Sequence, residues 1–251
     1  MDLGDRMKGY EKTYDSSILN RVPVIIRVDG KGFSKWTKSI KATKPFDPML
    51  GAAMSEAMRE TASNIEGCLF AYTQSDEMTF VLRNDQSLES TPWFGNRVQK
   101  ICSVVSSMVT ANFHMSGPPA YFDARVFAVP DINEAINCLI WRQNDAVKNS
   151  ISCATYYEVA KKVGKKTARK LMHKLNQKQQ QELLFNQTGI NWNNYPTKFK
   201  RGVGCRRVIK ILKIDDNICQ RSSWEIDDDL PTFAKDRLYL FDILKVEGET
   251  L

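Results

Sequence analysis

Val22-Pro23-Val24-Ile25-Ile26-Arg27-Val28-Asp29-Gly30 is the segment that decides the fold. It is a β-branched, apolar run of strand length that ends on a carboxylate and a glycine. Farther along the chain, residues 74–77 are polar and separate two apolar runs, residues 68–72 and 78–82. This second pattern is typical of a β-hairpin. If the hairpin pairs beside the first strand, Asp29 and Asp76 meet at one edge of a sheet.

Two carboxylates at strand ends, beside a glycine whose backbone can approach a ligand closely, suit Mg²⁺ and a nucleoside triphosphate. The other interpretation is that Asp29-Gly30 and Ser75-Asp76 are ordinary turns, because Asp, Gly and Ser are turn residues. On these two segments alone, both interpretations stay open.

The composition is that of a globular protein without a membrane span. A chain of 251 residues forms one large domain or two smaller ones, and 42% hydrophobic residues can bury a substantial core. No apolar run is long enough to cross a bilayer. The polar N-terminus lacks the apolar segment of a signal peptide, so we expect a cytosolic protein.

Cysteine and histidine usage excludes several enzyme classes. The six cysteines include no CxxC pair, which disfavours a zinc site or a redox dithiol. With only two histidines, His114 and His173, an HExxH metalloenzyme or a histidine-based nucleophilic mechanism is also disfavoured.

The positive charge is concentrated in two blocks of the C-terminal half. Residues 161–178 hold eight Lys/Arg and residues 198–213 hold seven more, and neither block contains an acidic residue. Charge runs are often only solvated faces, but paired acid-free blocks in a chain of net charge +7 favour phosphate binding. The residues that we expect to contact phosphates are Lys165, Lys166, Arg169, Lys170, Lys198, Lys200, Arg201, Arg206 and Arg207.

The N-terminal half predicts a β-α-β-β-α-β order. After a short helix packed on the surface within residues 1–20, the first strand ends at Asp29, and Asp47 caps a helix over residues 49–65. The hairpin, a helix over 92–114 and a strand over 121–129 follow. The helix residues expected in the core are Met49, Leu50, Ala53, Met54, Ala57 and Met58. This order is that of the ferredoxin-like unit, which polymerase palms and nucleotidyl cyclases share.

The C-terminal half predicts mainly helix. Asp131 caps a helix that runs to about residue 163, and a basic helix over 165–178 follows it. Residues 191–196 form an expected loop, 207–214 a strand, 224–232 an acidic loop, and 238–241 an apolar anchor for the tail. The apolar stripe of the basic helix is Ala168, Leu171, Met172 and Leu175. The predicted class is α+β, with a palm-like catalytic domain (residues 1–135) and a mostly helical, basic region (136–251) packed on it.

Four segments, residues 27–33, 74–77, 122–126 and 141–145, occur in an order and spacing that resembles the tRNA(His) guanylyltransferase family, including its guanylyltransferase-like members. The resemblance covers roughly residues 5 to 205. It implies an enzyme that adds nucleotides to the 5′ end of tRNA in the 3′-to-5′ direction. It also implies a palm-like catalytic domain, a mostly helical C-terminal part and a homotetramer.

The resemblance also assigns roles to residues. Asp29, the Gly30 carbonyl and Asp76 would hold two Mg²⁺ ions, and Glu77 would support the site, so that Asp29, Asp76 and Glu77 are the implied catalytic residues. ATP and GTP are the implied substrates, and Arg27 would join the basic blocks in binding tRNA. The implied nucleotide-binding residues are Asp29, Gly30, Lys31, Gly32, Phe33, Ser34, Lys44, Asp47, Ser75, Asp76, Arg97, Lys100 and Asn149.

One departure from the family pattern concerns the subtype. Eukaryotic members that add the extra guanosine to tRNA(His) carry His-Ile-Asn-Asn where this chain has Val147-Lys148-Asn149-Ser150, and often histidine where it has Ser34. The departure favours the guanylyltransferase-like branch, which repairs truncated 5′ ends by pairing with the 3′ strand of the acceptor stem. The alternatives are a tRNA(His) guanylyltransferase that adds one G, a non-catalytic tRNA-binding protein, and a cyclase acting on free nucleotide.

Overall fold

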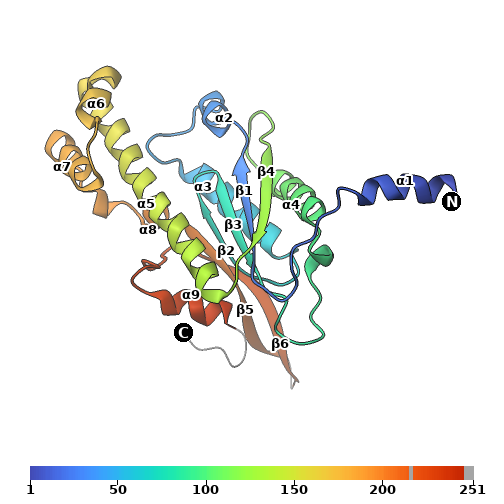
Figure 1. Cartoon of the computed structure of the whole chain (residues 1–251). Helices are drawn as coiled ribbons and strands as arrows, with labels where there is room; N and C mark the ends of the chain where they lie inside the picture. Colours follow the sequence, from blue (N-terminus) through green and yellow to red (C-terminus); the bar gives the residue numbers. More distant parts are fainter. Residues whose placement is uncertain (215–216, 246–251) are drawn as a thin grey trace.

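A six-stranded antiparallel sheet organises the chain. The structure is a computed structural model that describes residues 1–214 and 217–245. In the sheet the strands follow the order β4-β1-β3-β2-β5-β6 (Figure 1). Their bounds are β1 Val24–Gly30, β2 Cys68–Gln74, β3 Glu77–Leu82, β4 Phe122–Ala128, β5 Val203–Ile214 and β6 Asn217–Asp227.

Helices cover both faces of the sheet. Helices α3 (Pro48–Ala62) and α4 (Val98–Asn112) bury one core with Ile26 and Val28 of β1. Helices α5 (Ile132–Val163) and α9 (Arg237–Leu244) bury a second core with Ile25. Because the two faces of β1 are both buried, its sequence is almost continuously apolar. The predicted tail anchor is confirmed, since Leu240 and Phe241 lie in this second core.

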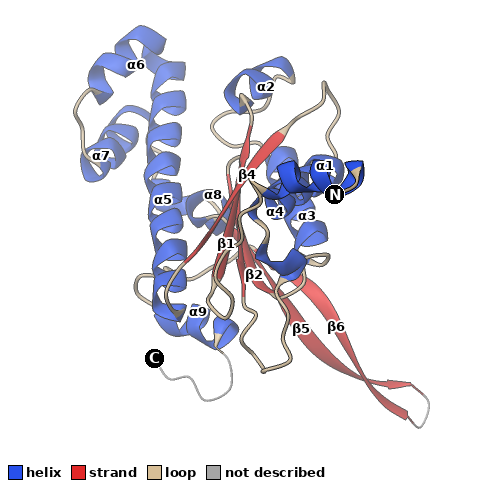
Figure 2. Ribbon diagram, turned by 45° about the vertical axis from the view of Figure 1, so that its right-hand side comes forward, coloured by secondary structure: helices blue, strands red, loops and turns tan. Residues whose placement is uncertain are grey.

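The remaining helices lie around this body (Figure 2). Helix α2 (Phe33–Ser39) follows β1, and the 3₁₀ turn η1 (Trp93–Asn96) precedes α4. Past the end of α5 come α6, α7, the 3₁₀ turn η2 and α8; their bounds are Lys165–Met172, Gln177–Thr188, Trp192–Asn194 and Thr197–Arg201. Helix α1 (Leu3–Lys12) projects from the body, and none of its residues is buried.

Several expectations from the sequence are wrong. The C-terminal region, expected to be mostly helical with one strand, contains two strands that join the sheet, since β5 pairs with β2 and β6 extends it. The expected strand at 207 begins at Val203, and the expected acidic loop is still strand as far as Asp227. Local composition did not predict the start of β5 or the end of β6, because both depend on pairing between strands.

The helix predictions need smaller corrections. Met49, in the first turn of α3, is 76% exposed rather than in the core. The basic helix ends at Met172 instead of residue 178, and only Ala168 of its expected stripe is fully buried. Helix α1 exists as expected but does not pack on the surface of its own chain.

Candidate active site

The turn between β2 and β3 is fastened to the end of β1. Ser75 and Asp76 form this two-residue turn, and Ser75 has a positive φ of 54°. The Gly30 amide donates a hydrogen bond to the Asp76 carbonyl across 3.1 Å. A Cβ atom at Gly30 would lie 2.4 Å from the Phe33 ring and 3.0 Å from the Asp76 Cβ, so only glycine allows this close approach. The expectation that Asp29 and Asp76 meet at one edge of the sheet is therefore confirmed.

Carboxylates are concentrated around Asp29. In the sheet register Asp29 is paired with Glu77 of β3 on one side and with Asp123 of β4 on the other. Burial raises the pKa of Asp29, and the negative charges of Glu77 and Asp123 raise it further. Burial also raises the pKa of Asp76, whose Oδ1 accepts a hydrogen bond from Ser75 Oγ. A bound cation would stabilise the ionised form of carboxyl groups whose pKa is raised in this way.

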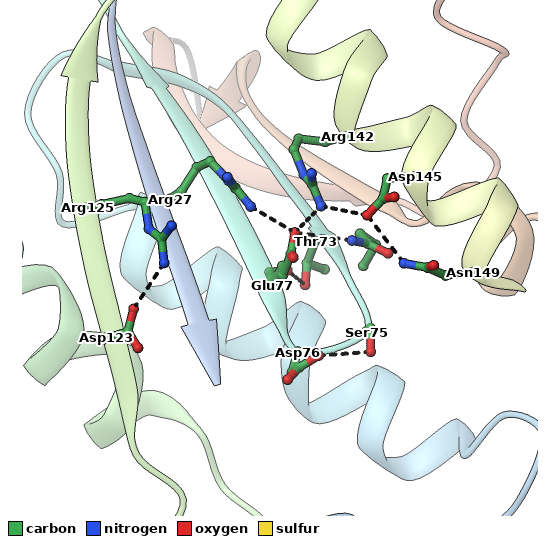
Figure 3. A network of polar contacts seen from close by, with 11 residues as sticks. Arg27, Thr73, Ser75, Asp76, Glu77, Asp123, Arg125, Arg142, Asp145 and Asn149 are labelled. Carbon is green, nitrogen blue, oxygen red and sulfur yellow. Dashed lines mark hydrogen bonds and ion pairs between the residues drawn. The ribbon is translucent and has the colours of Figure 1, made fainter. Parts of the chain in front are cut away.

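Two arginines neutralise Glu77 (Figure 3). The Arg142 guanidinium on α5 is ion-paired with Glu77 Oε2, and the Arg27 guanidinium lies 3.4 Å from the same oxygen. Arg142 also contacts Asp145 at 3.0 Å, and Asp145 in turn accepts a hydrogen bond from Asn149. The network joins α5 to the residue that directly follows Asp76.

Sequence reasoning missed Asp123 and Arg142 as site residues. Both lie inside segments that carried the family resemblance, residues 122–126 and 141–145. That position was the available signal, but only the sheet register and the packing of α5 show what the two side chains face.

A cleft of about 460 Å³ opens beside Asp76. Its size is that of a small-molecule site. Seven of the predicted nucleotide-binding residues line it: Phe33, Ser34, Lys44, Asp47, Ser75, Asp76 and Asn149. Phe46 and Phe199 also line it, with rings stacked at 5.2 Å and nearly parallel. The cleft therefore offers a flat aromatic wall, a lysine and acceptors for hydrogen bonds.

Asp47 stabilises the backbone around this cleft. It is the N-cap of α3 and accepts hydrogen bonds from the backbone amides of Leu50 and Thr43. Burial acts to raise the pKa of Asp47, but these amide hydrogen bonds outweigh it and lower the pKa. The carboxylate therefore stays ionised and fixes the loop that carries Lys44.

Lys31 and Gly32 form an exposed turn between β1 and α2, where Gly32 has a φ of +65°. They lie next to Gly30 in the chain but do not line the cleft. Their predicted contact with a nucleotide stays a prediction.

Arg97 and Lys100 lie at the other end of α4. Its first turn is held near residues 16–18, since Ser17 is bridged to Arg97 and the Val98 amide donates to the Ser16 carbonyl. Its last residues lead to Phe113, whose ring contacts Phe33 beside Gly30. A helix of 15 residues spans about 22 Å. The structure therefore does not bring these two basic residues to the Asp29–Asp76 edge.

The predicted RNA-contacting residues occupy four places. Lys165, Lys166, Arg169 and Lys170 are exposed on α6. On α8, Lys198 lines the cleft and pairs with Asp228 at 3.1 Å. The α8 residues Lys200 and Arg201 donate to backbone carbonyls, while Arg206 and Arg207 are exposed on β5. Arg27 differs, because it lies within the Glu77 network with its guanidinium 5.0 Å from the Trp141 ring.

The donor atoms at the sheet edge fit Mg²⁺. Among the residues described, no three His, Cys, Asp or Glu side chains are grouped closely enough to hold a metal alone. Mg²⁺ does not need such a cage, because it is commonly bound by one or two carboxylates together with substrate phosphates. Asp29 and Asp76 would supply the carboxylates, and the Gly30 carbonyl would supply a further oxygen.

The antiparallel sheet, the acidic edge and the adjoining cleft define a protein of the nucleotidyltransferase class. A family profile described as "tRNAHis guanylyltransferase" matches residues 4–130, and one described as "Thg1 C terminal domain" matches residues 134–229. The chain belongs to the tRNA(His) guanylyltransferase family, which is a family of nucleotidyltransferases.

Individual relatives agree with this assignment. The chain is 30% identical to the probable tRNA(His) guanylyltransferase of Drosophila melanogaster, over 78% of this chain and 70% of the relative. It is 27% identical to the tRNA(His) guanylyltransferase of Saccharomyces cerevisiae, over 82% of this chain and 92% of that one. A bacterial Thg1-like protein solved in complex with ATP superposes with a TM-score of 0.83 and 36% identity, over 98% of this chain and all of the other. The same type of protein in complex with GTP gives a TM-score of 0.80 at 37% identity, over 97% and 99% of the two chains.

No helix within the described ranges has the length and apolar character needed to cross a membrane.

Proposed function

We propose that this chain is a template-dependent 3′-to-5′ nucleotidyltransferase that repairs the 5′ end of tRNA. The observation that carries the proposal is the Gly30–Asp76 hydrogen bond, which sets Asp29 next to Asp76, a carboxylate that lines the cleft of about 460 Å³. The 5′-phosphate would attack the α-phosphorus of ATP and release pyrophosphate, and the 3′-hydroxyl of the next nucleotide would then attack the 5′-phosphorus of the activated end and release AMP.

This chemistry asks the protein for positioning and charge neutralisation more than for covalent work. Asp29, Asp76 and the Gly30 carbonyl would hold two Mg²⁺ ions, and the ions would supply Lewis-acid stabilisation of an attacking hydroxyl and of the leaving pyrophosphate or AMP. Lys44 supplies positive charge within the cleft, and Ser75 and Asn149 supply polar contacts. Glu77, already neutralised by two arginines, would position the turn. The chain therefore needs no histidine base.

The repair activity, rather than addition of a single guanosine, is supported by the block Val147–Ser150, which lacks histidine. It is also supported by the likeness to Thg1-like proteins solved with ATP and with GTP. The names of the curated relatives favour the second candidate, a tRNA(His) guanylyltransferase that adds one G.

The proposal also includes the domain organisation, the oligomeric state and the compartment of the chain. The strand order β4-β1-β3-β2, with α3 and α4 on one face, supports a ferredoxin-like palm for residues 1–135. Residues 136–251 would be the basic tRNA-binding region, the working form a homotetramer and the compartment the cytosol.

The test is extension of a 5′-truncated tRNA with Mg²⁺, ATP and all four nucleotides. We expect the added nucleotide to change when the opposing base of the 3′ strand is changed. Addition of G whatever the opposing base, and only to full-length tRNA(His), would instead establish the second candidate.

Two further outcomes are informative. Tight tRNA binding without any addition would identify a non-catalytic RNA-binding protein, and a cyclic product without tRNA would identify a cyclase.

A further inference from the structure

Helix α1 presents an apolar stripe that nothing in its own chain covers. Leu3, Met7 and Tyr10 follow one another at spacings of four and three residues, and Tyr14 continues the stripe just past the helix. These side chains are 66%, 43%, 65% and 78% exposed, in chain order. Spacings of four, three and four place them on one narrow face, the a/d face of a heptad.

The helix needs a partner for its own stability. Helices shorter than about 12–15 residues are marginal in water, and α1 has ten residues. Two of them, Gly4 and Gly9, each weaken a helix by about 1 kcal/mol relative to alanine. Since none of its residues is buried, packing within the chain does not offset these costs.

The charges of α1 and its N-cap argue for a protein partner. Its acidic residues Asp2, Asp5 and Glu11 balance its basic residues Arg6, Lys8 and Lys12. A helix that binds RNA phosphates or a membrane surface carries an excess of Lys and Arg. The segment before β1 is also fixed at its base, because the Tyr14 carbonyl accepts a hydrogen bond from Gln99 on α4. Helix α1 itself projects from the body, as Figure 1 shows.

The two charges that flank the stripe complement those of an identical helix. With Met7 at position a, Arg6 occupies position g and Glu11 position e. In a parallel pair of helices, position g of one faces position e of the other five residues later. Arg6 of each copy would then face Glu11 of the other, and both pairs form at once by symmetry.

We propose that α1 pairs in parallel with α1 of a second copy of this chain, through Leu3, Met7, Tyr10 and Tyr14. Stable interfaces bury roughly 1,200–2,000 Å², more than two such short helices provide, so the pair strengthens a larger association between copies. The proposal concerns association only, and it stands or falls apart from the proposed catalytic function.

Charge exchange at the flanking positions tests the pairing. By sedimentation, Arg6→Glu alone and Glu11→Arg alone should each weaken self-association about tenfold, because each places like charges opposite one another. The double variant Arg6→Glu/Glu11→Arg should restore it. Failure of the double variant to recover, or a wild-type chain that stays monomeric, would overturn the proposal.

Cysteine cross-linking tests the orientation. Leu3→Cys should give disulfide-linked dimers above the wild-type background, whereas Lys8→Cys, on the opposite side of α1, should not. Cross-links only between Leu3→Cys and Tyr10→Cys chains would mean an antiparallel pair. No cross-link at Leu3 would mean that the stripe docks elsewhere, and either result would overturn the parallel pairing. If deletion of residues 1–14 lowers tRNA affinity but leaves self-association unchanged, the pairing proposal is overturned and α1 is instead an RNA-binding helix.

Discussion

Arg142 on α5 is ion-paired with Glu77, the residue that follows Asp76, although the two lie 65 positions apart in the sequence. Only 4% of the Arg142 side chain is exposed. The pair therefore links a helix of the C-terminal region to the turn that carries one of the two proposed metal-binding carboxylates.

Replacing Arg142 by glutamine should lower the free energy of unfolding by about 3 kcal/mol, because Glu77 would lose its most buried counter-charge. Nucleotide addition should fall with it, as the Asp76 turn loosens. Chemical denaturation and an addition assay measure the two effects. The double variant Arg142→Gln/Glu77→Gln should recover much of the stability. The matched control is Arg125→Gln, whose ion pair with Asp123 is exposed and 3.8 Å long, and which should cost less than 1 kcal/mol.

Asp29→Asn should abolish nucleotide addition and yet raise the thermal unfolding midpoint by about 2 °C. The pKa of Asp29 is raised by burial and by its acidic neighbours, so folding opposes the carboxylate form at pH 7. The stabilisation of the variant relative to the wild type should fade as the pH falls through the raised pKa, because the wild-type Asp29 carboxyl is then neutral, as asparagine is. Calorimetry between pH 7 and pH 4 measures this trend. Equal loss of tRNA binding and addition would contradict the metal-binding role.

Gly30→Ala should impair both folding and activity, because the new Cβ would overlap the Phe33 ring and press on Asp76. We expect a loss of about 2 kcal/mol in the free energy of unfolding. Gly9→Ala is the control, since a Cβ there meets no atom within 4 Å and should not destabilise the chain. A fully active and stable Gly30→Ala variant would show that the close approach is unimportant.

Neutralising Lys165, Lys166, Arg169 or Lys170 should weaken tRNA binding and flatten its salt dependence. Each true phosphate contact removed should reduce the log–log slope by roughly one. Lys245→Gln is a suitable control, because Lys245 is paired with Asp242 on α9. Slopes that do not change would mean that α6 is only a solvated face.

Asp85→Asn should destabilise the chain by about 2 kcal/mol at pH 7, because a neutral amide replaces the carboxylate that pairs with the buried Arg83 at 2.7 Å. The hydrogen bond from Arg83 lowers the pKa of Asp85 from its ordinary value of 3.8. The stabilisation from this lowered pKa is present above pH 3.8 and is lost as the pH falls through the folded-state pKa. Denaturation from pH 7 downward should therefore show a constant gap between variant and wild type to about pH 4, and a narrowing gap below it.

Elements that depend on a few adjacent residues could be predicted without the structure. The apolar run to Asp29, the polar turn at Ser75–Asp76 and the Asp47 cap each depend on a few adjacent residues, and the structure has all three. Spacing along the chain was also enough to relate it to its family.

The neighbours of the carboxylates could not be predicted in this way, because they depend on how distant segments pack. The sheet register places Asp123 beside Asp29. The packing of helices brings Arg142 to Glu77 and keeps Arg97 a helix length away from the Asp29–Asp76 edge. The extension of the sheet by β5 is of the same kind. These relationships join residues far apart in the chain, and they arise because each strand and helix must bury its apolar face against a particular neighbour, which no local pattern specifies.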